Sequence, residues 1–321
     1  MIYRALGKTG LEVSVVGFGA SPLGDEFGAA DAEEATRAVH HAVDQGINFF
    51  DVSPYYGRTL AETRLGQALE GHRDKVILAT KAGRYDADPE TGFDFSAERI
   101  TQSVEESLTR LKTDTIDLFQ AHDIEFGHKV QIINETLPAM RKLKQSGKIR
   151  FVGITGYPLE ILKEVAEAVG VDAILSYCRF NVLDRSMDDV LTPFVQKRGI
   201  GLINASPLHM RVLTEKGPPE WHPAPKRVVQ AARAATRYCR DRGVDIAELA
   251  MQFALMHEVV ATTLVGTSKV RHVERNVKMV DDAPDPELLA GVLEIIKPVA
   301  NICWRSGRRE NDDPDAVPKQ S

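Results

Sequence analysis

Cysteine is scarce in this sequence of 321 residues, which contains only Cys178, Cys239 and Cys303. Their spacing matches neither a disulfide framework nor a zinc site, so we expect reduced thiols and no bound metal. The chain also lacks any apolar run approaching the ~20 residues that a membrane span needs. Residues 1–4 lack the basic start and apolar core of a signal peptide. These absences predict a cytoplasmic protein with no membrane partner.

Positive charge is not concentrated anywhere either. Lys and Arg number 40 against 46 Asp and Glu, a net charge of −6, and no long basic stretch is present. A nucleic-acid partner is therefore not expected. Apolar residues make up 43% and charged residues 27%, which excludes disordered, collagen-like and coiled-coil chains. Residues 305–321 are almost free of apolar side chains, so we expect a flexible tail there and a folded domain over residues 1–304.

Short β-rich runs alternate with helical patterns along the folded part. The runs occupy residues 13–20, 47–52, 76–80, 116–121, 150–154, 172–177, 201–205 and 261–265. The segments between them carry apolar residues at helical spacing. Pro138 must either kink the helix expected over 130–145 or lie in the first turn of a shorter one.

Eight such alternations predict a (β/α)8 TIM barrel, in which both faces of a parallel sheet are buried. The alternative is an open Rossmann sheet, which needs Gly-x-Gly-x-x-Gly after its first strand. Residues 17–22 come close to that motif, but Pro22 replaces the third glycine. Residues 2–6 and 11–13 flank a turn and predict an N-terminal β-hairpin cap. Two long loops, 85–95 and 208–225, are expected at the C-terminal face.

Ionisable side chains follow neighbouring strands of this barrel. Asp51 ends the second strand with Tyr56 in the loop behind it, Lys81 ends the third, and His122 follows the fourth. Strand ends of a barrel converge on one mouth, so we expect these four side chains to meet there. Each alone is compatible with a structural role, but together they predict a catalytic site.

The four residue types suit proton transfer at a carbonyl or alcohol oxygen. At an effective dielectric of about 20, an ammonium ~4 Å from a phenol contributes ~4 kcal/mol, enough to lower its pKa by about two or three units. We therefore expect Lys81 to lower the pKa of Tyr56, Asp51 to hold Lys81, and His122 to hydrogen-bond the reacting oxygen. The set holds no hydride source, so a cofactor is implied.

The motifs that carry these residues, 51–57 (DVSPYYG), Thr80-Lys81 and His122, closely resemble the aldo-keto reductases, and the likeness runs over about residues 3–299. The resemblance implies that Asp51, Tyr56, Lys81 and His122 form a catalytic tetrad. Three further stretches, 17–24, 122–126 and 217–223, are similar to the L-galactose dehydrogenase branch. That branch oxidises the anomeric carbon of an aldose with NAD.

The resemblance also implies a nicotinamide site after strands five to seven. Thr155 and Gly156 stand where many members carry Ser-Asn for the carboxamide, and Tyr177 where they carry Gln. Ser206 and Leu208 follow strand seven, where alanine replaces the aromatic residue that usually stacks on nicotinamide. Tyr177 is expected to take over part of that stacking, the alternative being a core aromatic.

After strand eight, Gly266, Thr267 and Ser268 open a helix whose amides and hydroxyls are expected to bind phosphate. Asn276 matches the family asparagine that contacts adenine. His272 and Gly266 occupy the positions at which NADP-preferring members carry arginine and lysine. NAD is therefore expected. Lys269, Arg271 and Arg275 lie nearby and could bind the additional phosphate of NADP, so NADP stays open. The alternative for these three residues is a solvated basic face with no role in binding.

A sugar substrate is expected to contact Tyr55, Asp123, Glu125, Trp221 and His222. Together the features predict an NAD-dependent aldose 1-dehydrogenase acting on L-galactose or L-fucose type sugars, as a monomer or homodimer. An NADPH-dependent reductase of aldehydes or ketones is the alternative enzyme. A binding or regulatory subunit fits a complete tetrad less well, and a metal-dependent hydrolase lacks its His-x-His after strand one.

Overall fold

The computed structural model describes residues 1–26 and 28–318. Within these ranges eight parallel strands close into one barrel, so the predicted (β/α)8 fold is confirmed. The strands are β3 (Val16–Gly19), β4 (Phe49–Asp51), β5 (Ile77–Ala82), β6 (Ile116–Ala121), β7 (Ile149–Gly156), β8 (Ala173–Tyr177), β9 (Gly201–Ala205) and β10 (Val260–Gly266). The first predicted run, 13–20, is divided between β3 and the strand before it.

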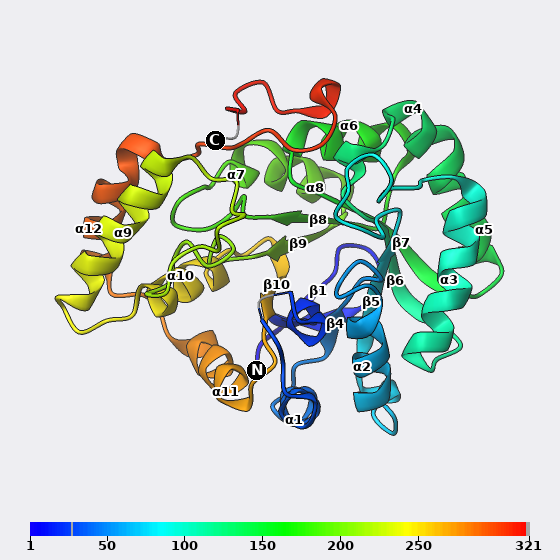
Figure 1. The fold of residues 1–321 in the computed structure, drawn as a ribbon, viewed down its shortest axis with the longest axis horizontal. Helices are drawn as coiled ribbons and strands as arrows, with labels where there is room; N and C mark the ends of the chain where they lie inside the picture. The colour runs from blue at the N-terminus through cyan, green and yellow to red at the C-terminus, as the bar shows by residue number, and fades with distance from the viewer. Residues whose placement is uncertain (27, 319–321) are drawn as a thin grey trace.

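Helices join successive strands and surround the barrel (Figure 1). They are α1 (Ala32–Asp44), α2 (Leu60–Ala68), α3 (Ala97–Leu111), α4 (Lys129–Gln131), α5 (Leu137–Gln145), α6 (Leu159–Val169), α7 (Met187–Val190), α8 (Thr192–Arg198), α9 (Lys226–Arg240), α10 (Ile246–Leu255), α11 (Val270–Lys278) and α12 (Pro286–Ile296). Pro138 is the second residue of α5 and follows a π-helical stretch at Ile132–Thr136. Helical backbone is continuous from α4 through this stretch into α5, so the proline is accommodated beside a π-helical distortion of one longer helix.

The predicted hairpin closes one end of the barrel. Strands β1 (Tyr3–Ala5) and β2 (Glu12–Ser14) pair antiparallel. Leu6, Leu11 and Val13 from this hairpin pack with the inward side chains of the barrel strands, such as Phe49 and Leu118. The bottom of the barrel is therefore filled with apolar side chains, and the opposite, C-terminal face is left for polar groups.

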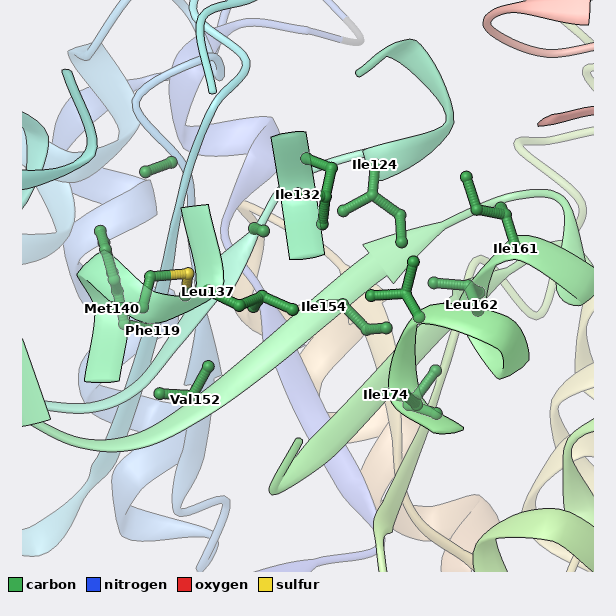
Figure 2. Close-up of a cluster of buried hydrophobic side chains, with 14 of the residues drawn as sticks. Phe119, Ile124, Ile132, Leu137, Met140, Val152, Ile154, Ile161, Leu162 and Ile174 are labelled. Atoms are coloured by element: carbon green, nitrogen blue, oxygen red, sulfur yellow. The ribbon is translucent and has the colours of Figure 1, made fainter. Parts of the chain in front are cut away.

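A second apolar layer fills the space between strands and helices. Figure 2 shows part of this layer, in which Ile154 of β7 lies between Leu137 of α5 and Leu162 of α6. Ile124, which is fully buried, joins the same cluster from a short 3-10 turn after β6. This buried side chain fixes the turn that begins at His122 and Asp123.

The C-terminal segment, residues 303–318, differs from the flexible tail expected from composition. Asp313 Oδ1 accepts the amides of Leu159 at 2.8 Å and Glu160 at 3.0 Å, at the start of α6. Asp313 Oδ2 lies 2.8 Å from Arg179 Nη1, an ion pair with both side chains buried. Figure 1 shows the segment in red beside α6. Residues 319–321 of the predicted tail lie outside the described residues.

The same segment carries one buried aromatic ring and several polar contacts. Trp304 is 3% exposed and stacks on Tyr157 with ring centroids 4.2 Å apart. Asn311 Nδ2 donates to the carbonyl oxygens of Glu125 and Gly127. Composition alone did not predict this order, because polar pairing rather than apolar area holds most of the segment.

Candidate active site

Alternation along the strands brings the polar side chains to the barrel mouth. Phe49 and Ala79 belong to the cluster inside the barrel. Asp51 and Lys81 come two residues later on β4 and β5, so they point the same way. Above the apolar side chains inside the barrel, toward the C-terminal face, the inward-facing side chains are therefore ionisable, as expected from the sequence.

Three of the four predicted catalytic residues form one chain of contacts. Lys81 Nζ donates to Asp51 Oδ1 at 2.5 Å and to the hydroxyl of Tyr56 at 3.3 Å. It also donates to the carbonyl oxygen of Val52 at 3.0 Å. Lys81 is 1% exposed and Asp51 3% exposed, so the pair is excluded from water. The ammonium is thereby held against the phenol.

Gln120 completes this arrangement and was not among the residues predicted from the sequence. It faces Lys81 in the parallel register of β5 and β6, and its Nε2 donates to Asp51 Oδ2 at 2.8 Å. Both carboxylate oxygens of Asp51 are therefore satisfied, as a buried charge requires. The available signal was its position two residues before His122, on the inward face of β6.

The pKa of Tyr56 moves in the direction opposite to the expectation. Burial disfavours the phenolate and raises the pKa to about 12, although the Lys81 ammonium acts to lower it. The loss of water around the phenol outweighs the neighbouring ammonium. Burial also works against the Lys81 ammonium, but Asp51 outweighs it and keeps the pKa of Lys81 above its usual value. In the protein without ligand, Tyr56 is therefore a protonated phenol next to the positively charged ammonium of Lys81.

His122 is held as a neutral imidazole with its proton on Nε2. Its Nδ1 lies 3.0 Å from Ser53 Oγ, which also accepts the amide of Tyr55. Because Ser53 Oγ already accepts that amide, we assign its own proton to Nδ1, which leaves Nε2–H as the donor. Burial lowers the pKa of His122 to about 3, helped by the charge of Lys81. The rings of His122 and Tyr56 meet edge to face, 5.9 Å apart.

A cavity of about 640 Å³ begins at Asp51 and Tyr56 and extends across the ends of β9 and β10. Six of the predicted cofactor residues line it: Ser206, Leu208, Gly266, Thr267, Ser268 and His272. Side chains that the sequence analysis did not assign also line it, including Ser21, Arg211 and Lys216. Ser206 and residues 209–211 have φ between 47° and 76°, so this loop turns through left-handed backbone beside the cavity.

The cavity suits an anionic dinucleotide. The Tyr56 phenol lines this cavity. Lys216, Lys269 and Arg211 line it as well, and Lys269 directly precedes α11; we call these three cations and the start of α11 the basic end of the cavity. Exposed cations and helix-terminal amides together favour phosphate. Thr267 Oγ1 accepts the amide of Lys269 at 3.1 Å and so shapes the turn that presents these amides.

Four other predicted cofactor residues are not among those lining the cavity. Thr155 is buried, and its Oγ1 accepts the amide of Asp123 at 2.9 Å. Gly156 faces the buried carboxyl of Glu125. Tyr177 lies against Tyr157 with centroids 5.4 Å apart, and Asn276 is buried on α11. Their cofactor contacts stay predictions.

The expected sugar contacts fall into two groups. Tyr55 and Asp123 lie beside His122, with Asp123 Oδ2 3.6 Å from His122 Nε2. Glu125 is fully buried beneath the C-terminal segment, and its Oε1 accepts from the amide of Tyr157 and the hydroxyl of Ser306. Burial raises the pKa of Glu125 well above its usual value. The structure thus places Glu125 outside the cavity, as a packed carboxyl group.

Trp221 and His222 lie in the long loop before α9 and are not among the residues that line the cavity. Trp221 is 58% exposed and stacks against His222. His222 Nδ1 accepts the amide of Ala224, and its Nε2 lies 3.0 Å from the carbonyl of His209. Both imidazole nitrogens are therefore used within the loop, and a sugar contact by His222 stays a prediction.

No helix among the described residues is long and apolar enough to span a membrane. In the same ranges no three His, Cys, Asp or Glu side chains are grouped so that they could hold a metal ion.

The chain is similar in sequence and in fold to known oxidoreductases. The model of the aldo/keto reductase family matches residues 15–292. L-galactose dehydrogenase of Arabidopsis thaliana is 49% identical over 96% of this chain and 98% of that protein. D-arabinose 1-dehydrogenase of Saccharomyces cerevisiae is 33% identical over 74% of this chain and 73% of its own length. The solved holo form of an aldo-keto reductase from Bacillus halodurans has a TM-score of 0.78 and 30% identity, and covers 98% of this chain and 100% of its own.

Proposed function

The chain belongs to the aldo/keto reductase family, and on that premise we propose that it oxidises the anomeric carbon of an aldose to a lactone with NAD. The observation that carries the proposal is the Asp51–Lys81–Tyr56 chain beside a neutral His122. It offers a proton acceptor and a hydrogen-bond donor to one oxygen. The 49% identity to L-galactose dehydrogenase supports a sugar of the L-galactose or L-fucose type.

In the proposed reaction Tyr56 first loses its proton to water, and the phenolate then removes the proton of the anomeric hydroxyl. Lys81 stabilises the phenolate that this step requires, and Asp51 and Gln120 keep the ammonium in place. His122 donates from Nε2 to the same substrate oxygen, which becomes the carbonyl oxygen of the lactone. NAD, when bound, supplies the acceptor for the hydride that leaves the anomeric carbon. Ser206, Leu208, Gly266, Thr267 and Ser268 would hold the cofactor.

Two features near α11 support NAD rather than NADP. Arg275 Nη2 lies 2.7 Å from Asp245 Oδ2 and 3.8 Å from Glu248 Oε2, so its charge is already paired. His272 lines the cavity, and burial together with neighbouring cations lowers its pKa, which leaves it uncharged at neutral pH. At position 272 a phosphate on the ribose would meet an uncharged imidazole rather than a guanidinium.

NADPH-dependent reduction of an aldehyde or ketone is the second candidate. It is favoured by Lys216 and Lys269, which line the basic end of the cavity and could pair with an additional phosphate. The same Tyr56 would then donate a proton to the carbonyl oxygen.

A panel of aldoses tests the function directly. Purified protein would be incubated with L-galactose, L-fucose and D-arabinose, each with NAD and with NADP, and reduced cofactor would be measured. We expect NADH from L-galactose or L-fucose. Absence of reduced cofactor from every sugar would exclude the proposed substrate class, and a marked preference for NADPH with carbonyl substrates would favour the second candidate.

Tyr56→Phe tests the catalytic role in the same assay. We expect turnover to be lost while the dissociation constant for NAD, measured by fluorescence, is unchanged. Tyr3→Phe is the matched control, because the Tyr3 hydroxyl donates to Gly46 at the surface of the N-terminal hairpin. Full activity of Tyr56→Phe would remove Tyr56 from its role.

We further propose that the protein acts in the cytoplasm as a monomer or homodimer. Its three cysteines are buried and unpaired, which suits a reducing compartment. Light scattering on the purified protein and fractionation of its host cell test these two statements.

A further inference from the structure

A second ion pair lies at the barrel mouth beside the catalytic residues. Arg84 Nη1 donates to Asp123 Oδ2 at 2.6 Å. Arg84 follows β5, the strand that carries Lys81, and Asp123 follows β6, directly after His122. The pair therefore belongs to the same two strand ends as half of the catalytic tetrad, and Arg84 was not among the residues identified from the sequence.

The guanidinium of Arg84 is held by aromatic rings. It lies 3.8 Å from the centroid of the Tyr55 ring, 5.5 Å from that of Phe93 and 5.9 Å from that of Phe126. Stacking on an aromatic face orients the planar guanidinium and leaves its edge N–H groups for hydrogen bonds. Arg84 is thus a fixed donor at the mouth rather than a mobile surface charge.

Asp123 is equally constrained. Its backbone is left-handed, with φ 51°, and its amide donates to Thr155 Oγ1 at 2.9 Å. The next residue, Ile124, is fully buried in the cluster shown in Figure 2. These contacts direct the carboxylate toward Arg84 and His122.

Both members of the pair stay charged. Although burial opposes ionisation, the guanidinium of Arg84, through its charge and its hydrogen bond, holds the pKa of Asp123 below its usual value. Asp123 in turn raises the pKa of Arg84 despite burial. The pair therefore presents a hydrogen-bond acceptor next to a donor.

Position relates this pair to the reaction. Asp123 Oδ2 lies 3.6 Å from His122 Nε2, the atom that would hold the reacting oxygen. Two substrate oxygens, one hydrogen-bonded to His122 Nε2 and the other to Asp123 Oδ2, would therefore lie close to each other. A group reached by the pair must therefore be attached close to the reacting carbon. A hydroxyl group can donate to Asp123 and accept from Arg84 together, whereas a ring oxygen can only accept.

We propose that Arg84 and Asp123 together bind the hydroxyl on the carbon next to the reacting carbon of the aldose. This inference rests on the proposed function and deepens it, because it defines the substrate class as 2-hydroxy aldoses. Arg84 has donors to spare, because the guanidinium has five N–H groups and only its Nη1 is hydrogen-bonded, to Asp123, among the described residues. Its side chain is 21% exposed, so the pair is accessible from the mouth.

The experiment compares L-galactose with 2-deoxy-L-galactose, using the wild-type holoenzyme and Arg84→Met. In the wild type we expect kcat/KM to be about tenfold to a hundredfold higher for L-galactose. Arg84→Met should lower kcat/KM for L-galactose by a similar factor and change that for the 2-deoxy sugar by less than about twofold. Arg84→Lys, which keeps the charge, should restore part of the preference.

The variants also separate binding from folding. Arg150→Met is the matched control, because Arg150 pairs with Asp117 at 2.6 Å near the start of β6 and β7, at the other end of the barrel. It should keep the wild-type preference between the two sugars. Equal losses on both sugars in Arg84→Met, or equal kcat/KM for both in the wild type, would overturn this inference alone. Oxidation of neither sugar by the wild type would overturn the proposed function with it.

Discussion

Gln120 donates its amide to the carboxylate oxygen of Asp51 that Lys81 leaves unbound, at 2.8 Å. Each carboxylate oxygen of Asp51 thus accepts a hydrogen bond, one from the Lys81 ammonium on β5 and the other from the Gln120 amide on β6. A carboxylate held in this way cannot rotate away from Lys81. Gln120 is therefore a positioning residue for the phenol, acting through two intermediate side chains.

Replacing Gln120 with leucine tests that relationship. The variant leaves Asp51 Oδ2 buried without a donor, which costs about 1–3 kcal/mol of unfolding free energy. We expect kcat for aldose oxidation to fall roughly tenfold, with KM for the sugar nearly unchanged. Gln102→Leu, which removes a hydrogen bond to Glu106 on the exposed side of α3, should leave both quantities intact. Wild-type kcat in Gln120→Leu would contradict the role.

The raised pKa of Tyr56 predicts how oxidation depends on pH. A phenol with a pKa of about 12 is protonated at neutral pH, and its phenolate fraction grows about tenfold for each pH unit below that value. We therefore expect kcat/KM for aldose oxidation to rise steadily from pH 7 to pH 9. His122, with a pKa of about 3, should add no acidic limb in that range. A flat profile would show that another group controls the proton transfer.

Buried neutral histidines predict a loss of stability in acid. Burial lowers the pKa of His209 and of His122 to about 3. The unfolded chain takes up protons below its ordinary histidine pKa of about 6.5, whereas the folded protein does not, so the free energy of unfolding decreases as pH falls from there toward 3. In urea unfolding, the two histidines should lower the free energy of unfolding by about 3 kcal/mol between pH 6.5 and pH 5. Glu125 offsets part of this loss, because its raised pKa favours the folded state as pH falls.

His209→Gln tests the origin of that loss. The variant should reduce the slope of unfolding free energy against pH by about 1.4 kcal/mol per unit, the equivalent of one proton. His128→Gln removes an exposed histidine and should leave the slope unchanged. An identical slope in His209→Gln and wild type would exclude His209 as a contributor.

Asp313 predicts that the C-terminal segment supports the whole fold. Asp313→Ala removes the acceptor for two amides of α6 and leaves the Arg179 charge less well paired. Removing one partner of a buried ion pair costs about 3 kcal/mol, which should appear as a lower midpoint of thermal unfolding. Asp315→Ala, at an exposed position of the same segment, should unfold like the wild type. Equal midpoints for both variants would contradict the prediction.

A charge introduced at His272 should change the cofactor preference. His272→Arg places a guanidinium where a largely neutral imidazole lines the basic end of the cavity. We expect the dissociation constant for NADP to decrease roughly tenfold, with that for NAD little changed. Arg237→His, a change on α9 away from the cavity lining, is the control. An unaltered ratio of the two constants would show that the ribose phosphate binds elsewhere.

The barrel and the meeting of four polar side chains were predictable for the same local reason. Strand alternation fixes which residues face inward, and parallel strands bring their C-terminal ends to one mouth. Asp51, Lys81 and His122 follow from that rule once the strands are placed. Gln120 obeys it as well, and could have been found by asking which inward side chains near the tetrad are polar.

Other features depend on distances that a linear pattern does not contain. Arg84 lies in a loop, and only the approach of Phe93 and Phe126 gives its guanidinium a fixed place. The pKa of Tyr56 depends on how completely the chain excludes water from the phenol, which residue types alone do not determine. Glu125 was expected at a sugar because it follows a strand end, but its turn directs it under the C-terminal segment.

The cap on α6 has a consequence for how the protein is made. The acceptor for the first amides of this helix is supplied from 154 positions further along the chain. Until residue 313 has been synthesised, the first amides of α6 can be satisfied only by water, and Glu125 lacks the cover of the C-terminal segment. The start of α6 therefore receives its side-chain cap only after the last strand of the barrel, β10, has been synthesised.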